Sequence, residues 1–592
     1  MAPSSSLGSY LSPLNSPPPA QAPEAKDYTQ DGTVGLHGQP VLASQTGKWK
    51  ACAFLLVYEG IERMAFYGIA SNMVVYLTTK LHADTVSSVR NVNNWTGCVW
   101  MTPILGAYIS DSYLGRFWTF SLAALIYLLG MILLTMAVSL KSLKPTCESG
   151  VCNKASTFQI VFFYTSLYTI AVGAGGTKPN ISTFGADQFD DLNQEEKKHK
   201  ASFFNWWMFT SYIGALMATL GLVYIQENVG WGLGYGIPTI ALFLALVIFY
   251  LGTPFYRHKV RKTKSPTQDL LRVPITAFAN RKLGVPRQSW ELHEFDLQYY
   301  IDTGKRQLRH TPFFRFLDKA AIKEGNANSS RIPCTVTQVE EAKLVLGMTM
   351  IWLVTLIPCA ITGQINTLFV KQGTTLDRHL GGSGILIPAA ALGSSLTLTK
   401  LLAILVYDSC FVSLMRRLTG NPRGITLLQR PGAGFAMQLA AVAVAYAAEA
   451  RRRHVIQVHH ITRADEIVPM SIFWLLPQYV MLGIADVFAS VGLLELFYDQ
   501  SPEDMRSLGT TFFTGGIGMG NFLDSFLVTV VDLASRSGGG KSWIGKNLND
   551  SHLDFYYLFL LGIAILNLGV FLWVSSVYVY KREVKQVKEE WA

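Results

Sequence analysis

The chain has 592 residues, of which half are apolar and 12% aromatic, whereas only 15% are charged. A soluble domain carries about 25% charged residues, so this chain cannot cover its apolar surface with polar groups, and lipid is the expected solvent. The net charge of +10 is spread over short basic clusters beside apolar runs, which excludes a basic nucleic-acid-binding face and fits loops at a membrane surface.

The N-terminal segment, residues 1–48, is rich in Ser, Pro, Gly and Gln and has no apolar core, so it predicts a disordered cytosolic tail and not a signal peptide. A membrane-spanning helix needs about 20 apolar residues. An N-terminal six-helix bundle is therefore predicted over residues 49–255, with apolar runs near 51–80, 94–114, 117–140, 157–178, 202–226 and 232–255.

A polar stretch over residues 256–337 carries many Lys and Arg and predicts a cytosolic linker. A second six-helix bundle is predicted over residues 338–581, with runs near 340–370, 384–415, 424–449, 467–497, 508–533 and 553–580, followed by a cytosolic tail at 582–592. Six plus six helices around a charged linker are typical of an all-α, two-bundle membrane transporter.

Basic residues in the loops predict the orientation, because Lys and Arg concentrate on the cytosolic side. Most basic clusters agree with cytosolic N- and C-termini, but Arg451–Arg453 falls on the outer side in this arrangement. The nearby pair Cys147 and Cys152 lies in a polar loop, where a disulfide and two free thiols are equally compatible with the sequence.

Charged residues within the first apolar run indicate a proton site. Glu59, Glu62 and Arg63 lie at positions i, i+3 and i+4, on one face of a helix. Two carboxylates share one guanidinium, so one carboxylate is incompletely neutralised and could hold an exchangeable proton. The alternative is a static structural network.

Lys178 and Asp486 are isolated charges in apolar runs of opposite bundles. Each is costly alone in a membrane, and we predict that they pair across a central cavity and separate when a solute or proton arrives. Tyr67, one turn from Arg63, and the polar pair Gln364 and Asn366 are further candidates for solute binding. For Asp524, function and structure are equally compatible with the sequence.

Several motifs together resemble the proton-dependent oligopeptide transporter (POT) family and its plant nitrate/peptide branch. Glu59-x-x-Glu62-Arg63-x-x-Phe66-Tyr67-Gly68 is similar to the family's first-span signature. The further similar motifs are Gly175-Gly-Thr-Lys178-Pro, Phe184-Gly-Ala-Asp187-Gln188-Phe189, Phe203-Phe-Asn205-Trp206-Trp207, Phe473-Trp474-x-x-Pro477-Gln478-Tyr479 and Phe497-Tyr498-Asp499-Gln500.

The resemblance implies a major facilitator fold with 12 transmembrane helices in two six-helix bundles. It implies proton coupling through Glu59, Glu62 and Arg63, a cavity role for Lys178, and a gating loop that contains Asp111, Gly115 and Arg116. Asp486 occupies the position of a tenth-span glutamate, shortened by one methylene.

Substrate and location follow from the resemblance only in outline. Some plant nitrate carriers have a histidine where this chain has Thr362, so a proton-coupled symporter of a small organic solute, first of all di- and tripeptides, is favoured. Nitrate, a plant hormone, a specialised metabolite and a sensor role stay as alternatives. The plasma membrane and the vacuolar membrane both fit, and the oligomeric state is open.

An enzyme is disfavoured, because the sequence has no evident nucleophile–base arrangement, metal cluster or complete phosphate-binding G-x-x-x-x-G-K-[ST] loop. The expected partners are the solute, protons as the coupling ion and the lipid bilayer, with no metal, other cofactor or nucleic acid.

Overall fold

The structure is a computed structural model that describes most of residues 28–581. The gaps are at 146, 149–150, 153–154, 191, 260–266, 285–290, 297, 301–305, 324–332, 381–383, 422–423, 464–465, 503–505 and 538–540. The expected tail segments 1–27 and 582–592 lie outside the described residues.

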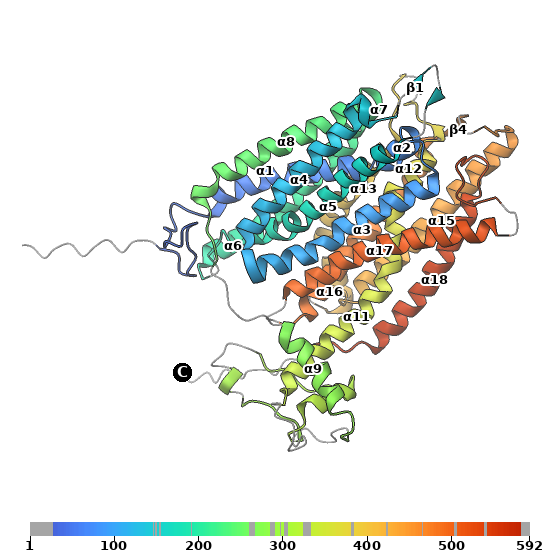
Figure 1. The fold of residues 1–592 in the computed structure, drawn as a ribbon. Helices are drawn as coiled ribbons and strands as arrows, with labels where there is room; N and C mark the ends of the chain where they lie inside the picture. Colours follow the sequence, from blue (N-terminus) through green and yellow to red (C-terminus); the bar gives the residue numbers. More distant parts are fainter. Residues whose placement is uncertain are drawn as a thin grey trace, which may run out of the picture.

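The N-terminal half contains six long helical segments (Figure 1). They are α1 (Lys48–Ala70), α3 (Thr85–Ile109), α4 (Arg116–Ser139), α5 (Thr157–Ala186), α6 (Gln194–Leu216) continued through a π-helical turn into α7 (Val223–Asn228), and α8 (Trp231–Leu251). A short helix, α2 (Met73–Thr79), follows α1.

The C-terminal half repeats this organisation with six further segments. They are α11 (Val336–Gly363) with its extension α12 (Leu368–Gly373), α13 (Gly393–Val406) with α14 (Val412–Thr419), α15 (Gln429–Val458), α16 (Leu476–Gln500), α17 (Arg506–Arg536) and α18 (Leu553–Val577). The predicted six-plus-six arrangement therefore appears in the structure.

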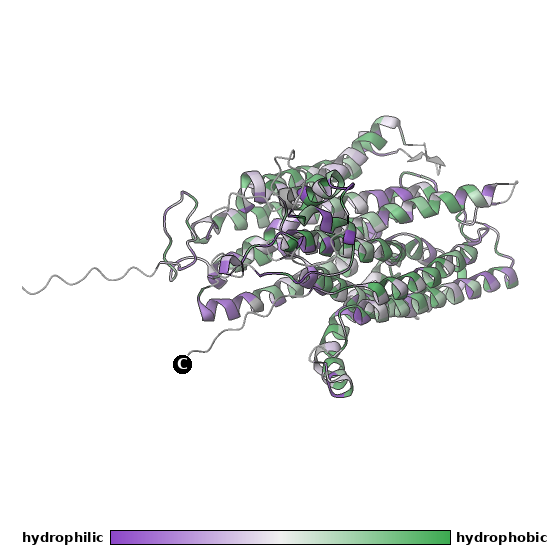
Figure 2. Ribbon diagram, turned by 90° about the horizontal axis from the view of Figure 1, so that it is seen from below, coloured by the Kyte–Doolittle hydropathy of each residue, from purple (hydrophilic) through white to green (hydrophobic). Residues whose placement is uncertain are grey.

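Ten helical segments among the described residues are long and apolar enough to cross a membrane. The helices α1 and α3 have 23 and 25 residues but are more polar, because α1 carries the Glu59 cluster and α3 carries Arg90 and several asparagines. Their polar groups are largely buried, whereas α18 exposes Leu566 and Trp573 by 72% and 69%. Figure 2 shows the hydrophobic residues along the long helices and more hydrophilic residues toward their ends. This distribution fits a bundle whose solvent is lipid.

The two halves are separate bundles whose main contacts run along two helix pairs. In the first bundle α1 packs against α6 and α8, while α5 packs against α3 and α4. In the second bundle α15 packs against α16 and α18, and α11 packs against α17 and α18. The bundles meet where α3 contacts α17 and where α6 contacts α13.

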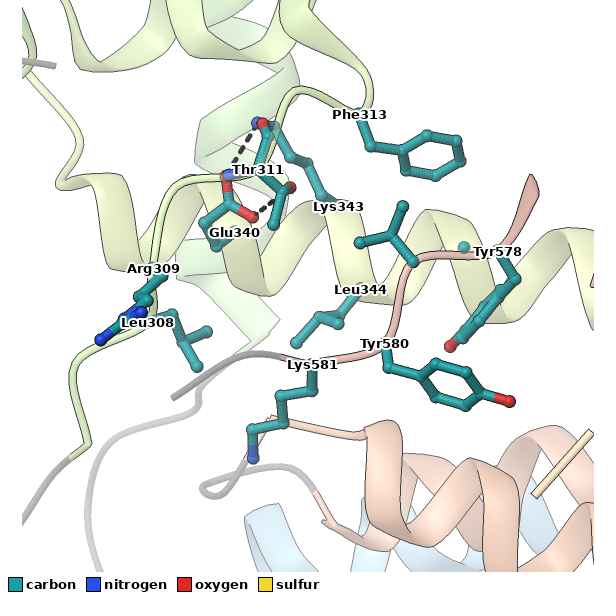
Figure 3. Close-up of a pocket in the computed structure, with 12 residues that line it drawn as sticks. Leu308, Arg309, Thr311, Phe313, Glu340, Lys343, Leu344, Tyr578, Tyr580 and Lys581 are labelled. Carbon is teal, nitrogen blue, oxygen red and sulfur yellow. Dashed lines mark hydrogen bonds and ion pairs between the residues drawn. The ribbon is translucent and has the colours of Figure 1, made fainter. Parts of the chain in front are cut away.

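The linker is partly folded, although its sequence predicted only a polar stretch. Helix α9 (Thr267–Ala279) and the 3-10 helix η6 (Arg315–Ala321) share a small apolar core with the start of α11. Figure 3 shows Thr311 between Glu340 and Lys343 of α11, in a groove that also receives Tyr578 and Tyr580. The Lys343 ammonium lies 2.6 Å from Asp318 and 2.8 Å from Glu340.

Three residues of this region could together hold a metal ion, because the ligand atoms of His310, Asp318 and Glu340 lie within 4.8 Å of one another. The ammonium of Lys343 contacts both carboxylates. It supplies the positive charge that a metal ion would bring, so we interpret the group as an ion-pair cluster that fixes the linker to α11.

The expectation of disorder up to residue 48 is wrong for residues 28–47. This segment forms bridges such as Tyr28 with Leu42 and Val34 with His258. Fully buried Arg257 donates to the carbonyl oxygens of Ala43 and Thr46 and pairs with Glu196 at 2.8 Å. Composition did not reveal this order, because it depends on a single distant arginine.

Two short sheets lie at the end of the molecule opposite α9 (Figure 1). Strand β1 (Cys147–Glu148) pairs with β2 (Val151–Cys152), and β3 (Leu376–Asp377) pairs with β4 (Val468–Ser471). The register of the hairpin places Cys147 opposite Cys152, which brings the two backbones together. A disulfide there stays a prediction.

The basic cluster that conflicted with the orientation, Arg451–Arg453, lies near the end of α15. Arg452 is fully buried and pairs with Glu449 at 2.7 Å, and Arg453 lies 3.6 Å from Asp554. The Arg451 guanidinium stacks over Trp474. Because partners within the fold neutralise two of the three charges, the cluster carries less unpaired positive charge than a residue count assumes.

Candidate functional site

The charged cluster of α1 is buried between α1 and α6. Arg63 Nε lies 2.6 Å from Glu59 Oε1 and 3.3 Å from Glu62 Oε2. Ser211 of α6 donates a second hydrogen bond, of 2.7 Å, to Glu59 Oε1. Glu59 and Glu62 are each 1% exposed. The structure therefore brings together the three residues that the sequence placed on one helical face.

The two carboxylates differ in their hydrogen bonds. Glu59 accepts from Arg63 and from Ser211, whereas neither oxygen of Glu62 has a hydrogen-bond donor among the described residues. The 3.3 Å contact to Arg63 is close enough for an ion pair but lacks hydrogen-bond geometry. A buried carboxylate without a hydrogen-bond donor is costly when it is ionised. Protonation therefore lowers the free energy of the site more at Glu62 than at Glu59.

Small residues allow α6 to approach the cluster. A Cβ on Gly214 would lie 3.0 Å from Arg63 Cβ and closer still to the carbonyl oxygen of Gly60. A Cβ on Gly60 would lie 2.8 Å from a methyl group of Thr210. The two glycines thus let the α1 and α6 backbones touch, which places Ser211 within reach of Glu59.

Lys178 of α5 is buried and has no hydrogen-bond or ion-pair partner among the described residues. Its ammonium nitrogen lies 3.9 Å from the ring centre of Phe66 and 4.2 Å from that of Trp100. Cation–π contacts with two rings replace part of the lost hydration. Glu62 lies within electrostatic range of this ammonium. Lys178 is thus a cation that an incoming anion can approach without breaking an ion pair.

The expected pair between Lys178 and Asp486 is absent from this structure, so that expectation is wrong for the conformation described. Asp486 Oδ2 lies 2.6 Å from the ammonium of Lys400 on α13, and Asp486 Oδ1 accepts a hydrogen bond from Ser490. The physical reason is proximity: α13 and α16 pack directly against each other within one bundle. Lys178 lies in the other bundle.

Asp524 forms a polar junction between the bundles. Asn93 of α3 donates to Oδ2 at 2.6 Å, and Gln364 donates to Oδ1 at 2.6 Å. Tyr556 donates a further hydrogen bond of 3.2 Å. Gln364, expected to bind solute, is 1% exposed and holds Asp524 instead of facing open space. Asn366, in the turn between α11 and α12, is half-buried and stays a candidate.

The expected gating loop forms a tight connection between α3 and α4. Asp111 lies in a π-helical turn over Ser110–Leu114 and is exposed. Gly115 has φ of 78°, a conformation that favours glycine. Arg116 forms an ion pair with Asp187 at the end of α5, and Lys259 lies 3.6 Å from the same carboxylate. Arg116 thereby ties the start of α4 to the end of α5.

A family model described as the POT family matches residues 117–544. The chain is 68% identical over 559 residues to Protein NRT1/PTR FAMILY 5.1 of Arabidopsis thaliana, covering 94% of this chain and 95% of that protein. It is 48% identical to Protein NRT1/PTR FAMILY 5.2 of the same plant, with 94% and 96% covered.

The chain belongs to the POT family.

Solved POT structures have the same fold. The crystal structure of the POT family transporter PepTSo matches with a TM-score of 0.66 at 22% identity, over 90% of this chain and 99% of that one. A mutant of a peptide transporter POT, in complex with alafosfalin, matches with a TM-score of 0.60 at 15% identity, over 90% and 97%. The protein is therefore a multi-pass membrane transporter with the major facilitator fold, 12 transmembrane helices in two bundles.

The sequence did not predict three side chains that contact the charged residues described above, namely Lys400, Ser211 and Trp100. Lys400 is one of two charged residues, with Asp408, in the apolar run near 384–415, and that signal could have revealed it. Ser211 and Trp100 had no comparable signal, because serine and tryptophan are common in membrane helices. Their roles depend on contacts between helices far apart in the sequence.

Proposed function

We propose that the protein is a proton-coupled secondary active symporter of a small organic solute and works by alternating access. The observation that carries the proposal is the buried Glu62 carboxylate, which has no hydrogen-bond donor among the described residues and lies within electrostatic range of the Lys178 ammonium. Glu59 and Arg63 neutralise each other beside it. Glu62 and Lys178 thus form the part of the cluster whose charge changes with a proton.

The coupling follows from charge balance. With Glu62 ionised, its negative charge offsets Lys178. With Glu62 protonated, the ammonium of Lys178 is an uncompensated cation in a low-dielectric site and attracts an anionic group of the solute. Proton and solute therefore favour each other's binding, which is the requirement for symport. Glu59, Glu62 and Arg63 form the proton-coupling cluster, and Lys178 and Tyr67 belong to the solute site.

Contacts between the bundles support alternating access. Glu227 at the end of α7 pairs with Arg378 of the second bundle at 2.9 Å, and Lys371 donates to Thr78 at 3.3 Å. These contacts and the β1–β2 hairpin lie at helix ends opposite the start of α1. If the termini and the linker are cytosolic, this end is the outer one and these contacts hold it closed.

The solute that we propose is a carboxylate-bearing organic molecule, first of all a di- or tripeptide. A C-terminal carboxylate suits Lys178, and the peptide transporters among the solved relatives share the fold. Nitrate would also suit a lysine, but the seventh span offers Thr362, whose hydroxyl donates to the carbonyl of Cys359. No cofactor or metal enters the scheme, and an enzymatic reaction is not part of it. The plasma or vacuolar membrane is the expected site.

Uptake into proteoliposomes tests the proposal. Purified protein is reconstituted with a pH-sensitive dye inside the vesicles, and Ala-Phe, nitrate or a hormone-like carboxylate is added outside at a pH of about 5.5 or about 7.5. Symport predicts that an organic carboxylate acidifies the lumen and accumulates only under an inward proton gradient. Nitrate as the sole solute that moves protons would contradict the organic-solute assignment, and gradient-independent uptake would contradict coupling. Binding of a solute without any flux would indicate a sensor.

A further inference from the structure

The acid that would recognise a substrate amine is already occupied. Asp486 Oδ2 lies 2.6 Å from the Lys400 ammonium, and Oδ1 accepts a hydrogen bond of 2.5 Å from Ser490. Both oxygens therefore have a donor within the second bundle. An incoming ammonium group would have to displace Lys400, so it would exchange one ion pair for another and gain little.

The Lys400–Asp486 pair joins α13 to α16, and α13 is also the helix of the second bundle that contacts α6. The two side chains are 20% and 25% exposed, in contrast to the buried Glu59 cluster. Tyr67 of α1 and Tyr212 of α6 both lie within electrostatic range of Lys400. These tyrosines come from the opposite bundle, and α6 contacts α13, the helix that carries Lys400. The pair thus lies near the contact between α6 and α13, where the two bundles meet.

The balance of charges in this region favours an anion. The Glu59 cluster, Lys178 and the Lys400–Asp486 pair together comprise three cations, Arg63, Lys178 and Lys400, and three acids, Glu59, Glu62 and Asp486. With all acids ionised the group is neutral, and with Glu62 protonated it carries one positive charge. A solute with one carboxylate and no ammonium restores neutrality, whereas a zwitterion leaves the positive charge uncompensated.

We propose that Lys400 is a specificity-determining residue that withdraws Asp486 from amine recognition, so that the solute is a monocarboxylate whose binding needs no free amino group. The inference rests on the proposed transport function and narrows its substrate class from carboxylates in general to those without a free amine, so that a free di- or tripeptide is no longer the first candidate. N-blocked peptides and amine-free organic acids belong to this class. Lys178, which lies against the rings of Phe66 and Trp100, binds the carboxylate, and the partly exposed Trp100 ring contacts an apolar part of the solute beside it.

Three matched probes test the inference. Ala-Phe has both charges, N-acetyl-Ala-Phe lacks the ammonium, and Ala-phenethylamide lacks the carboxylate. Binding is measured as thermal stabilisation of the purified full-length protein and as competition for uptake into proteoliposomes. The wild type is expected to bind N-acetyl-Ala-Phe at least as tightly as Ala-Phe and to ignore the amide.

Variants of Lys400 give the decisive comparison. Lys400→Met leaves Asp486 without its cation, so the preference should shift at least about tenfold toward Ala-Phe, since a partly buried carboxylate that has lost its cation gains from a new one. Lys400→Arg should keep the wild-type order. The double variant Lys400→Met with Asp486→Asn removes both charges, avoids an uncompensated acid that could impair folding, and should abolish the gain for Ala-Phe.

Three results would overturn the inference. The wild type could bind N-acetyl-Ala-Phe at least about tenfold more weakly than Ala-Phe, or none of the three probes could stabilise the protein. The third is that Lys400→Met has the same preference between the two peptides as the wild type. The proposed function fails separately. If N-acetyl-Ala-Phe is preferred but its uptake ignores the proton gradient, the specificity assignment stands and proton coupling is wrong. If uptake is proton-driven but requires the free amine, coupling stands and the role of Lys400 is wrong.

Discussion

At the scale of single residues, the protein contains two kinds of buried lysine. Lys343 contacts Asp318 and Glu340 within 2.8 Å, so its charge is compensated within the fold. The Lys178 ammonium instead lies over the ring faces of Phe66 and Trp100, and no carboxylate contacts it among the described residues. An ammonium without a carboxylate lowers the stability of the folded protein, and such a cost is expected where the charge serves to bind a ligand.

Replacement of each lysine by methionine should separate these roles. Lys178→Met keeps an apolar chain of similar length and removes an unpaired charge, so it should leave the free energy of unfolding unchanged or raise it by about 1–4 kcal/mol while abolishing uptake. The control Lys343→Met leaves Asp318 and Glu340 without their cation, so it should lower the free energy of unfolding by about 3–5 kcal/mol. Thermal unfolding in detergent measures both. A large loss of stability in Lys178→Met would show that this lysine is structural.

The sequence predicted some of these residues and missed others for a physical reason. Glu59, Glu62 and Arg63 lie within about one helical turn, so their spacing alone predicts their contact. The partner of Asp486 is far away in the chain, on α13, and the choice between Lys178 and Lys400 depends on which helices pack together. Spacing carries no such information, and the opposite-bundle partner was wrongly preferred.

At the scale of elements, the contact between α1 and α6 positions the proton site. The backbones touch at Gly60 and Gly214, about one turn from Ser211 and Arg63. Further along the same span, Gly221 would have nothing within 4 Å of an added Cβ. Gly214 and Gly221 therefore lie on the same span but differ in their surroundings: Gly214 is packed against α1, whereas Gly221 has open space beside it.

Alanine at each position tests the importance of the contact. Gly214→Ala inserts a methyl group against the α1 backbone, so it should lower the free energy of unfolding by about 1–3 kcal/mol and slow uptake, because Ser211 moves away from Glu59. Gly221→Ala is the matched control and should be neutral in both assays. Thermal unfolding and initial uptake rates measure the effects. Equal behaviour of the two variants would mean that close packing at Gly214 does not position the cluster.

The positions of the long helices could be predicted from the sequence, because a run of apolar residues is enough to specify a membrane-spanning helix. Each apolar run that the sequence showed corresponds to one long helical segment, and the linker separates the two sets. The folded parts at residues 28–47 and within 256–337 were not foreseen. Their order depends on single buried side chains, Arg257 in the first case and Lys343 in the second, whose partners lie far along the chain.

At the scale of the whole molecule, the transporter consists of two bundles joined by few polar contacts among the described residues. Asn93 with Asp524 and Glu227 with Arg378 connect the bundles through side chains from each. The proton site and Lys178 belong to the first bundle, whereas the Lys400–Asp486 pair belongs to the second. A solute between them would contact both bundles at once, which is how its binding could change their relative position.

The central claim is that the proton on Glu62 drives uphill transport, and the Glu62→Gln variant tests it most directly. Glutamine keeps the size of the side chain and the neutral form but cannot release a proton. Proteoliposomes are preloaded with unlabelled N-acetyl-Ala-Phe to measure exchange, or left empty under an inward proton gradient to measure accumulation of the labelled compound, with a protonophore as control. We expect the variant to exchange solute but to lose proton-driven accumulation. Accumulation equal to that of the wild type would contradict the account.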